Sequence, residues 1–313
     1  MSERTGRSDA LLCGDDAAAA PCFESYPSRS TEIGPGFRVR RALPVREHRL
    51  VGPWCFLDEM GPVTIAAGTG LDVPPHPHMG LQTVTWLLEG ELLHRDSLGS
   101  EQPIRPGQLN LMTAGRGVAH SEEVVTPAGG TLRGLQLWIA QPESTRHGAP
   151  AFAHHAALPE LPAGDAIATL LVGRLVAAES PAAVASPALG ADLRVGRAGR
   201  LSLPLDPGFE HALVVVSGSL EIDGRRAEPG ALHYLGRGRE RLEAPAGAGT
   251  RLLLVGGAPF GERVLMWWNF VARTPGEIAA AREDWQAGRR FGPVSGYPGA
   301  RLAAPAFTDR FRR

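Results

Sequence analysis

The chain repeats one pattern of short apolar segments and glycine turns, and this repeat constrains the fold more than any other feature. Each copy has a strand-like segment, a glycine turn, a second strand-like segment and a Pro-Gly turn before a third. The turn glycines are Gly90 and Gly218. The copies are VTWLLEGEL with RPGQLNLM, and LVVVSGSLEIDG with EPGALHYL. The sequence therefore predicts two β-units of one design, and the first predicts a β-hairpin that turns at Glu89-Gly90.

Composition favours an all-β fold. The 313 residues include 39 Gly and 27 Pro, which suits many short strands joined by tight turns better than long helices. Between Phe37 and Leu137, turn residues interrupt the apolar segments about every 8 to 12 residues, the spacing typical of a β-sandwich or β-barrel. One capping box, Thr274-Pro275-Gly276-Glu277, predicts a helix over EIAAAREDWQAGRR with Trp285 as a packing residue. We expect an all-β protein with a short C-terminal helix.

These patterns divide the chain into five segments. The beginning of the chain lacks periodicity and predicts a flexible tail, and a stretch rich in Pro, Ala and His between the two copies lacks a strand pattern. The predicted segments are 1–30 (flexible tail), 31–140 (first β-domain), 141–165 (crossover linker), 166–272 (second β-domain) and 273–313 (C-terminal helix and tail).

Charge and cysteine content limit the partners and the compartment. The 32 basic and 33 acidic residues give a net charge of −1, so the sequence has no electrostatic footprint for nucleic acid or an anionic membrane. The first residues contain no long apolar run typical of a signal peptide or an anchor. Three cysteines are too few for a disulfide framework, and Cys55 lies in an apolar run, as expected of an inert core thiol. We expect a cytoplasmic protein without direct contact to nucleic acid or membrane.

Two pairs of polar residues point to a metal site. His76 and His78 lie two positions apart, and so do His120 and Glu122. Alternate residues of a strand point to the same face, so each pair can present both side chains to one ion. Three imidazoles and one carboxylate suit Fe, Mn, Ni, Cu or Zn, but without a thiolate they do not match a structural Cys-type zinc site.

Either pair alone is weak support for a metal site. The chain has ten histidines, and histidines in Gly- and Pro-rich turns are commonly surface residues or hydrogen-bonded ones. The two pairs together, within one β-unit, favour a metal site. Three or four protein ligands would leave positions for water or substrate, which is typical of a working metal ion.

The motif residues also identify a family. The segments HPHMGLQTVTWLLEGELLHRDSLGS, RPGQLNLMTAGRGVAHSEE, GLQLW and WWNF resemble the pirin family of the cupin superfamily, and the similarity covers nearly everything after the tail. The resemblance implies an all-β bicupin, in which two β-barrel (β-sandwich) cupin domains are followed by the short helix. It also implies one mononuclear metal in the N-terminal domain, most often Fe(II), with His76, His78, His120 and Glu122 as its ligands.

The resemblance suggests two classes of function. Some pirins are associated with quercetin 2,3-dioxygenase activity, which implies an iron-dependent oxidoreductase acting on a flavonol-type small molecule. Similarity to eukaryotic pirin implies instead a redox- or metal-dependent regulatory protein that binds a transcription factor or a metabolic enzyme. A metal-bearing protein without activity is a third alternative, and no residue selects the substrate.

Two further residues are candidates for a role beside the metal. Many cupins carry Glu four residues after the second histidine, where this chain has Gln82. An amide can orient a bound water or substrate, but it cannot take a proton as a carboxylate does. His94, on the second strand of the predicted hairpin, is a candidate to support a metal ligand from behind.

The second copy has lost the metal motif. Counting from the turn glycine and the Pro-Gly turn places Pro204, Asp206 and Glu243 at positions equivalent to those of the histidines. We therefore expect one metal ion per chain, bound in the first half.

Overall fold

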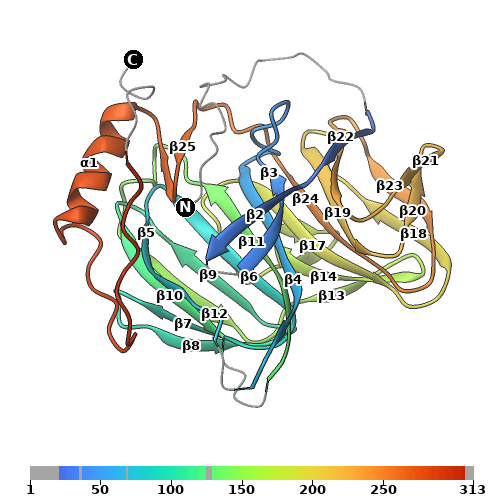
Figure 1. Ribbon diagram of the computed structural model, residues 1–313. Coiled ribbons are helices and arrows are strands. Elements are labelled where there is room, and N and C mark those ends of the chain that lie inside the picture. The colour runs from blue at the N-terminus through green and yellow to red at the C-terminus, as the bar shows by residue number, and fades with distance from the viewer. Residues whose placement is uncertain (1–20, 35–36, 68–69, 125–128, 307–313) are drawn as a thin grey trace.

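Two β-sandwich barrels account for most of the fold (Figure 1). The computed structural model describes residues 21–34, 37–67, 70–124 and 129–306. The first barrel pairs a seven-stranded sheet, in the order β12-β9-β6-β11-β4-β3-β2, with a four-stranded sheet, in the order β5-β10-β7-β8. Its strands are β2 (Arg29–Gly34), β3 (Phe37–Leu43), β4 (Trp54–Ile65), β5 (Val73–His78), β6 (Leu81–Glu89), β7 (Leu92–Asp96), β8 (Glu101–Ile104), β9 (Leu109–Thr113), β10 (Val118–Val124), β11 (Gly130–Ala140) and β12 (Ala151–His155).

The second barrel repeats this arrangement. Its seven-stranded sheet has the order β1-β22-β19-β24-β17-β14-β13, and its four-stranded sheet has the order β18-β23-β20-β21. Its strands are β1 (Glu24–Pro27), β13 (Glu160–Ala163), β14 (Ala166–Val172), β17 (Ala188–Val195), β18 (Gly199–Pro204), β19 (Glu210–Ser217), β20 (Leu220–Ile222), β21 (Arg225–Ala227), β22 (Ala231–Gly236), β23 (Arg241–Ala246) and β24 (Thr250–Gly257). A small ribbon, β15 (Arg174–Leu175) with β16 (Ala178–Glu179), lies in the loop between β14 and β17.

The two strand orders confirm the internal repeat. Strands β5 to β11 of the first barrel occupy the same places in their sheets as β18 to β24 of the second. The predicted hairpin at Glu89-Gly90 is wrong, however, because β6 and β7 belong to different sheets. Gly90, with a φ of +85°, turns the chain from one sheet of the sandwich into the other. Two consecutive apolar strands around a glycine predict a turn, but they do not specify that the strands pair.

The edge strands differ from the predicted segment boundaries. Strand β1, which falls in the predicted tail, pairs with β22 of the second barrel, and the first part of that tail lies outside the described residues. Strand β12, which falls in the predicted linker, pairs with β9 and extends the first barrel. Strand β13 pairs with β14. These strands have only four or five residues each, which is too few positions to show a clear alternation.

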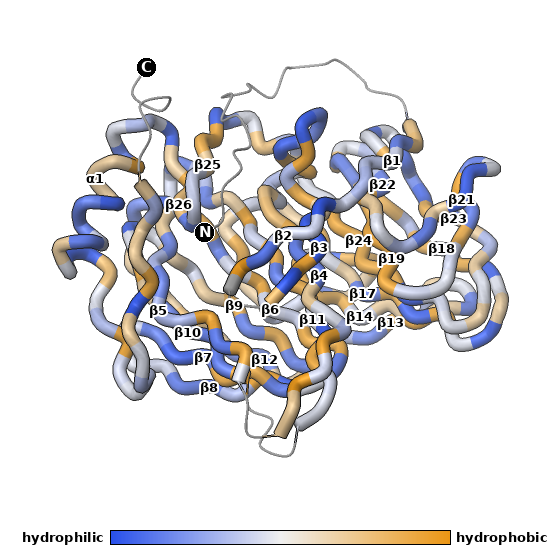
Figure 2. The backbone as a smooth tube through the Cα atoms, viewed as in Figure 1, coloured by the Kyte–Doolittle hydropathy of each residue, from blue (hydrophilic) through white to orange (hydrophobic). Residues whose placement is uncertain are grey.

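The core between the two seven-stranded sheets joins the barrels. Side chains from β6, β9 and β11 form one buried cluster with side chains from β19, β22 and β24. Figure 2 shows the apolar segments concentrated along these central strands. Trp54 lies in this cluster, and its indole N–H donates to the carbonyl oxygens of Leu189 and Gly256 at 3.1 and 2.9 Å. The sheets therefore pack face to face as two layers of one continuous core.

The C-terminal segment returns to the first barrel. Strands β25 (Leu265–Trp267) and β26 (Phe270–Ala272) precede helix α1 (Pro275–Gln286), which lies beside β5 and β10 in Figure 1. The Thr274 side chain accepts a hydrogen bond from the backbone N–H of Glu277, which confirms the predicted helix start. Trp285 is buried in a cluster with Met79 and Ala119 of the first barrel, which confirms it as a packing residue.

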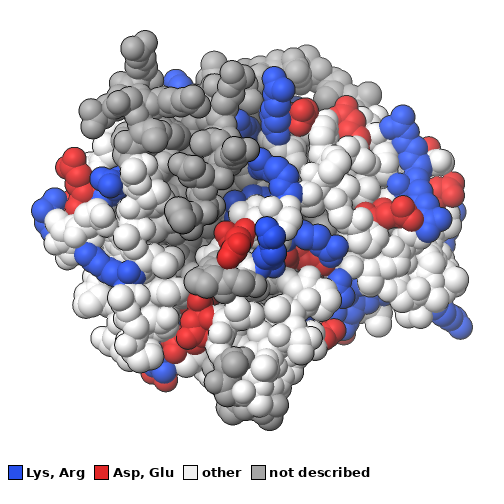
Figure 3. Space-filling model, viewed as in Figure 1, with Lys and Arg blue, Asp and Glu red and all other residues white. Residues whose placement is uncertain are grey.

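Two further observations bear on partners. No helix within the described residues is both long and apolar enough to cross a bilayer. On the face shown in Figure 3, basic and acidic side chains lie interspersed over the second barrel. A mixed surface of this kind agrees with the net charge of −1.

Replacing Trp54 tests the contact between the barrels. We expect Trp54→Ala to lower the free energy of unfolding by about 3 to 5 kcal/mol, because it leaves a cavity in the shared core. Trp54→Phe keeps the six-membered ring but loses the pyrrole ring, with the N–H that makes both hydrogen bonds, so it should cost less, about 1 to 3 kcal/mol. Urea unfolding followed by circular dichroism measures both. Equal losses for the two variants would show that ring packing contributes nothing.

Candidate metal centre

Strand pairing brings three histidines together. Strand β10 pairs with β5 in antiparallel register, with His120 opposite His76 and Val118 opposite His78. Residues in register on paired strands share a face, so all three imidazoles point into the first barrel. Their donor nitrogens lie within 4.8 Å of one another, and each side chain is buried. Among the described residues, these three form the group suited to hold a metal ion.

The hydrogen bonds of the rings leave donor atoms free for a metal. His76 Nδ1 lies 2.9 Å from the Pro74 carbonyl oxygen, which accepts its proton and leaves Nε2 with a lone pair. His78 Nδ1 and His120 Nε2 are buried and have no hydrogen-bond partner within the described residues. A buried, unpartnered ring nitrogen is costly unless it binds something. These atoms therefore fit a metal ion.

Burial keeps the three imidazoles neutral. It lowers the pKa of His76 to about 4, and it lowers the pKa of His78 and His120 well below the usual value, with the neighbouring histidines adding to the effect. A neutral imidazole offers the lone pair that a metal needs, whereas an imidazolium does not. At neutral pH the site is thus ready to bind a cation without first losing protons.

Glu122 lies next to this group but is not part of it. It follows His120 on β10 and stands opposite His94 of β7. Burial raises the pKa of the Glu122 carboxyl to about 7, and the Thr85 hydroxyl opposes that shift. The donor atoms that lie within 4.8 Å of one another are those of the three histidines. Ligation by Glu122 therefore stays a prediction.

His94 lies behind His120, away from the other two histidines. Its Nδ1 is 3.3 Å from His120 Nδ1, and its Nε2 is 3.0 Å from Oδ2 of Asp96. Burial alone would raise the pKa of Asp96, but hydrogen bonds from His94 and Ser100 outweigh it and hold the pKa below its usual value. His94 was expected from the sequence as a support for a metal ligand, whereas Asp96 was not. The missed signal was a third pair two residues apart, His94-Arg95-Asp96.

Aromatic rings surround the histidines. The edge of Trp138 contacts His78, with ring centroids 5.2 Å apart, and Phe56 stacks on Trp138 at 4.0 Å. Phe152 of β12 stacks on His94 at 4.3 Å. These rings exclude water from the sides of the site, and an apolar wall strengthens electrostatic interactions inside it.

Gln82 faces the junction between the barrels. Alternation along β6 places Gln82 on the face that joins the shared core, whereas Thr85 faces the barrel interior and Glu122. The Gln82 amide donates to Thr113 Oγ1 at 2.8 Å and to the Ala183 carbonyl at 3.2 Å, and its oxygen accepts from the Ala185 N–H at 2.8 Å. These contacts hold a loop of the second barrel. A role for Gln82 toward a substrate stays a prediction.

The second barrel has an apolar interior at the equivalent place. Leu203 of β18 lies opposite Leu242 of β23, and both side chains are buried in the core of this barrel. Glu243 points outward, and its side chain is 43% exposed. Counting from the Pro-Gly turn had placed Glu243 at the position equivalent to His120. Strand faces alternate, so an alignment off by one residue exchanges inside and outside. The described part of the second barrel holds no group like the three histidines.

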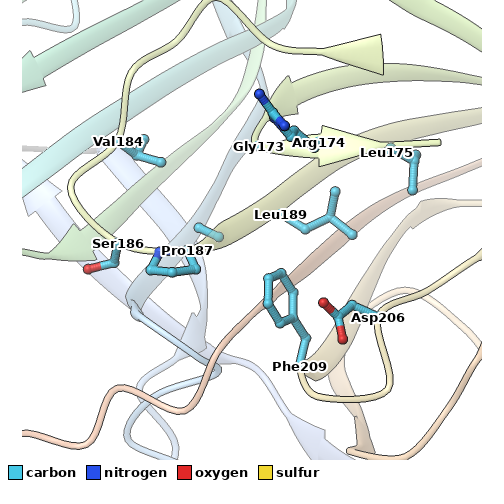
Figure 4. Close-up of a pocket in the computed structure, with 10 residues that line it drawn as sticks. Gly173, Arg174, Leu175, Val184, Ser186, Pro187, Leu189, Asp206 and Phe209 are labelled. Atoms are coloured by element: carbon cyan, nitrogen blue, oxygen red, sulfur yellow. The ribbon is translucent and has the colours of Figure 1, made fainter. Parts of the chain in front are cut away.

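A cavity of about 340 Å³ lies in the second barrel, away from the histidines. Figure 4 shows Leu189, Phe209 and Asp206 around it, with Arg174 on the opposite side. Asp206 and Arg174 are exposed, and Arg174 pairs with Glu179. Exposed charges give a cavity little selectivity because water screens them. This cavity is therefore weaker support for a functional site than the buried histidine group.

Cys55 is fully buried, and burial raises the pKa of its thiol to about 12. A thiol that stays protonated is a poor nucleophile. The structure therefore agrees with an inert core cysteine.

The depressed pKa values of the histidines make the metal-free protein sensitive to acid. An unfolded histidine takes up a proton near pH 6.5, whereas His76 does so only near about 4. Between these values the unfolded chain binds more protons, so the free energy of unfolding falls as pH falls, by about 1.4 kcal/mol per pH unit per histidine. We expect this slope in urea unfolding of the chelator-treated protein. Replacing all three histidines with Gln should make the slope less steep, with the remainder due to His211, whose pKa burial also lowers to about 4. An unchanged slope would contradict the assignment.

Gln82→Glu tests the role of the amide at the junction. The substitution replaces an NH2 donor with a carboxylate oxygen next to the Ala183 carbonyl, so we expect a loss of about 1 to 3 kcal/mol in unfolding free energy. Gln108→Glu is a matched control, because Gln108 only accepts a hydrogen bond, from the Arg105 N–H. Thermal unfolding compares the two. A Gln82→Glu protein as stable as the control would mean that the hydrogen bonds of the Gln82 amide do not contribute to the free energy of unfolding.

Comparisons with known proteins agree with this architecture. The Pirin family profile matches residues 36–139, and the profile of the Pirin C-terminal cupin domain matches residues 190–292. A Pseudomonas aeruginosa protein named "Putative quercetin 2,3-dioxygenase" is 50% identical over 284 residues, which cover 90% of each chain. A "Pirin-like protein" of Caulobacter vibrioides is 38% identical over 84% of this chain and 93% of its own.

A solved structure extends the similarity to three dimensions. The crystal structure titled quercetin 2,3-dioxygenase from Acinetobacter baumannii is 44% identical and covers 92% of this chain and 96% of its own, with a TM-score of 0.88. The profiles together match more than half of the chain, and the relatives cover most of its length. The fold is the bicupin fold expected from the sequence, and the chain belongs to the pirin family.

Proposed function

We propose that this protein is a metal-dependent dioxygenase that acts on a flavonol-type small molecule. The observation that carries the proposal is the group of three buried, neutral histidines whose donor nitrogens lie within 4.8 Å of one another. His76, His78 and His120 would hold one divalent ion, and Glu122 would complete the set. The ion is most simply Fe(II), and the nitrogen and oxygen donors also suit Mn, Ni, Cu or Zn.

The names of the relatives support the substrate class. The P. aeruginosa relative and the A. baumannii structure both carry the name quercetin 2,3-dioxygenase. A bound divalent ion would act as a Lewis acid that makes a flavonol hydroxyl more acidic. The chain itself supplies positioning and proton transfer.

Glu122 is the residue best suited to handle the substrate proton. Without a metal its pKa is about 7, and as a ligand it could take up the substrate proton only by partly releasing the ion. Gln82 cannot do this, because an amide has no basic oxygen of that strength, and its polar atoms already hold the loop at Ala183 and Ala185. Trp138 and Phe152 would exclude bulk water from the reacting atoms.

Histidine variants test the metal site and the activity together. We expect about one metal ion per wild-type chain, and oxygen uptake with quercetin. His78→Ala and His120→Ala should each remove both, because losing a ligand costs more affinity than losing a partner behind a ligand, which already weakens binding about 10- to 100-fold. His147→Ala is the control, since His147 is 62% exposed. Metal analysis and an oxygen electrode provide the two measurements.

Each outcome separates the alternatives. Metal binding without oxygen uptake across a flavonol panel would favour the regulatory protein, in which the metal controls a surface for a protein partner. Absence of metal from protein produced with each candidate ion would end the proposal. A stoichiometry near two would show that the second barrel also binds metal. The cytoplasmic location and any protein partner stay predictions.

A further inference from the structure

A line of three buried side chains runs from a turn of the first barrel to the histidine group. Asp96 and His94 lie on β7, and His120 lies on the neighbouring β10. Their residues are 2%, 4% and 2% exposed. Asp96 Oδ2 is 3.0 Å from His94 Nε2, and His94 Nδ1 is 3.3 Å from His120 Nδ1. Each contact joins two polar atoms, so each needs one donor and one acceptor.

The turn after β7 sets the first donor and acceptor. Asp96 Oδ1 accepts hydrogen bonds from the backbone N–H groups of Leu98 and Ser100, both at 2.9 Å. A backbone N–H can only donate, so this oxygen must be an acceptor. An ionised carboxylate has only acceptors, which leaves Oδ2 as an acceptor toward His94. The proton in the contact between Asp96 and His94 is therefore on His94 Nε2.

The same reasoning continues across His94. A neutral imidazole carries one N–H, so a proton on Nε2 makes His94 Nδ1 an acceptor. His120 Nδ1 must then donate, and the lone pair of His120 is on Nε2. That nitrogen is one of the two buried, unpartnered ring nitrogens of the histidine group. Phe152, stacked on His94 with rings 12° from parallel, holds the plane of the middle ring.

We propose that Asp96 and His94 are positioning residues, which fix the proton of His120 on Nδ1 and so leave Nε2 free to bind the metal. This inference rests on the proposed function, because a free Nε2 on His120 is useful only if the site binds a metal. The proton positions themselves belong to the metal-free protein as well. Hydrogen bonds behind a ligating histidine commonly set its tautomer and its strength as a ligand.

Asp96→Asn should reverse both tautomers. The turn still requires an oxygen facing the N–H groups of Leu98 and Ser100, so the new NH2 group faces His94 Nε2 and donates to it. The proton of His94 then moves to Nδ1, and His120 becomes the acceptor there. Its own proton moves to Nε2, on the side where the metal would bind. The substitution changes few atoms of Asp96, yet it places a proton on His120 Nε2, the nitrogen that would bind the metal.

The first measurement is made on metal-free protein. In wild-type protein labelled with ¹⁵N-histidine, long-range proton–nitrogen NMR spectra should show His94 protonated at Nε2 and His120 at Nδ1. Asp96→Asn should show the opposite pattern at both residues. A wild-type His94 that carries protons on both nitrogens, or a His120 protonated at Nε2, would overturn the proposal. The wild-type spectrum alone can overturn the proposal, so that part of the test does not depend on how well the variant folds.

The second measurement is metal affinity, with Co(II) as the probe. Asp96→Asn should bind Co(II) about 10- to 100-fold more weakly than wild type, the loss typical of a partner behind a metal ligand. Asp165→Asn is the matched control, because Asp165 accepts a backbone hydrogen bond from Arg200 in the second barrel, at 2.7 Å. It should bind Co(II) as wild type does. The thermal midpoints of the metal-free proteins show whether a loss of affinity is merely a loss of fold.

The two readouts separate this inference from the proposed function. Suppose the wild-type protein shows the predicted tautomers but binds no metal. That result would refute the metal site and would still agree with the proposed proton positions. A wild-type protein that binds Co(II) with the opposite tautomers would refute the role of Asp96 and His94 alone. An Asp96→Asn protein with unchanged tautomers and affinity would also overturn it.

Discussion

The face-to-face packing of the two seven-stranded sheets is the contact on which the rest of the structure depends. Strand β6 lies in the middle of it and is buried on both faces along nearly its whole length. One face joins the shared core through Val84, Trp86 and Leu88, and the other lines the first barrel. A sheet buried on both sides cannot leave a polar group without a partner. The hydrogen bonds of Gln82 and Trp54 across the junction follow from that requirement.

The three histidines of the proposed metal centre lie on the four-stranded sheet of the first barrel, on strands β5 and β10. Strand β5 is an edge strand, so Pro74, Pro75 and Pro77 cost no hydrogen bonds to a second neighbour. The C-terminal segment then covers this edge, because the Leu302 N–H donates to the Pro75 carbonyl and the Val271 N–H to the Met79 carbonyl. The backbone on both sides of His76 and His78 is thus held by residues from the far end of the chain.

Gly80 allows the C-terminal segment to approach the backbone after β5 closely. Its φ is +72°, and a Cβ added there would lie 2.1 Å from the Val271 carbonyl oxygen. Only glycine allows the C-terminal segment to contact the chain directly after the His-x-His motif. Local sequence could predict the His76 and His78 pair, since strand alternation needs only two positions. The spacing of His94 and Asp96 was a local signal as well, but the importance of Asp96 comes from the register of β7 against β10. Local sequence could not predict the outward direction of Gln82.

The sequence by itself determined the repeated β-unit, the helix start at Thr274 and the three histidines, because each depends on spacing along a few residues. Only the tertiary structure decided how the strands divide between sheets, which edge strand each barrel receives, and which face each polar residue occupies. The apolar strands around Gly90 satisfy the pattern of a hairpin equally well, and burial between two layers selects the arrangement that covers both faces. Short edge strands such as β1 and β12 carry little pattern of their own, so the sheets they complete determine their place.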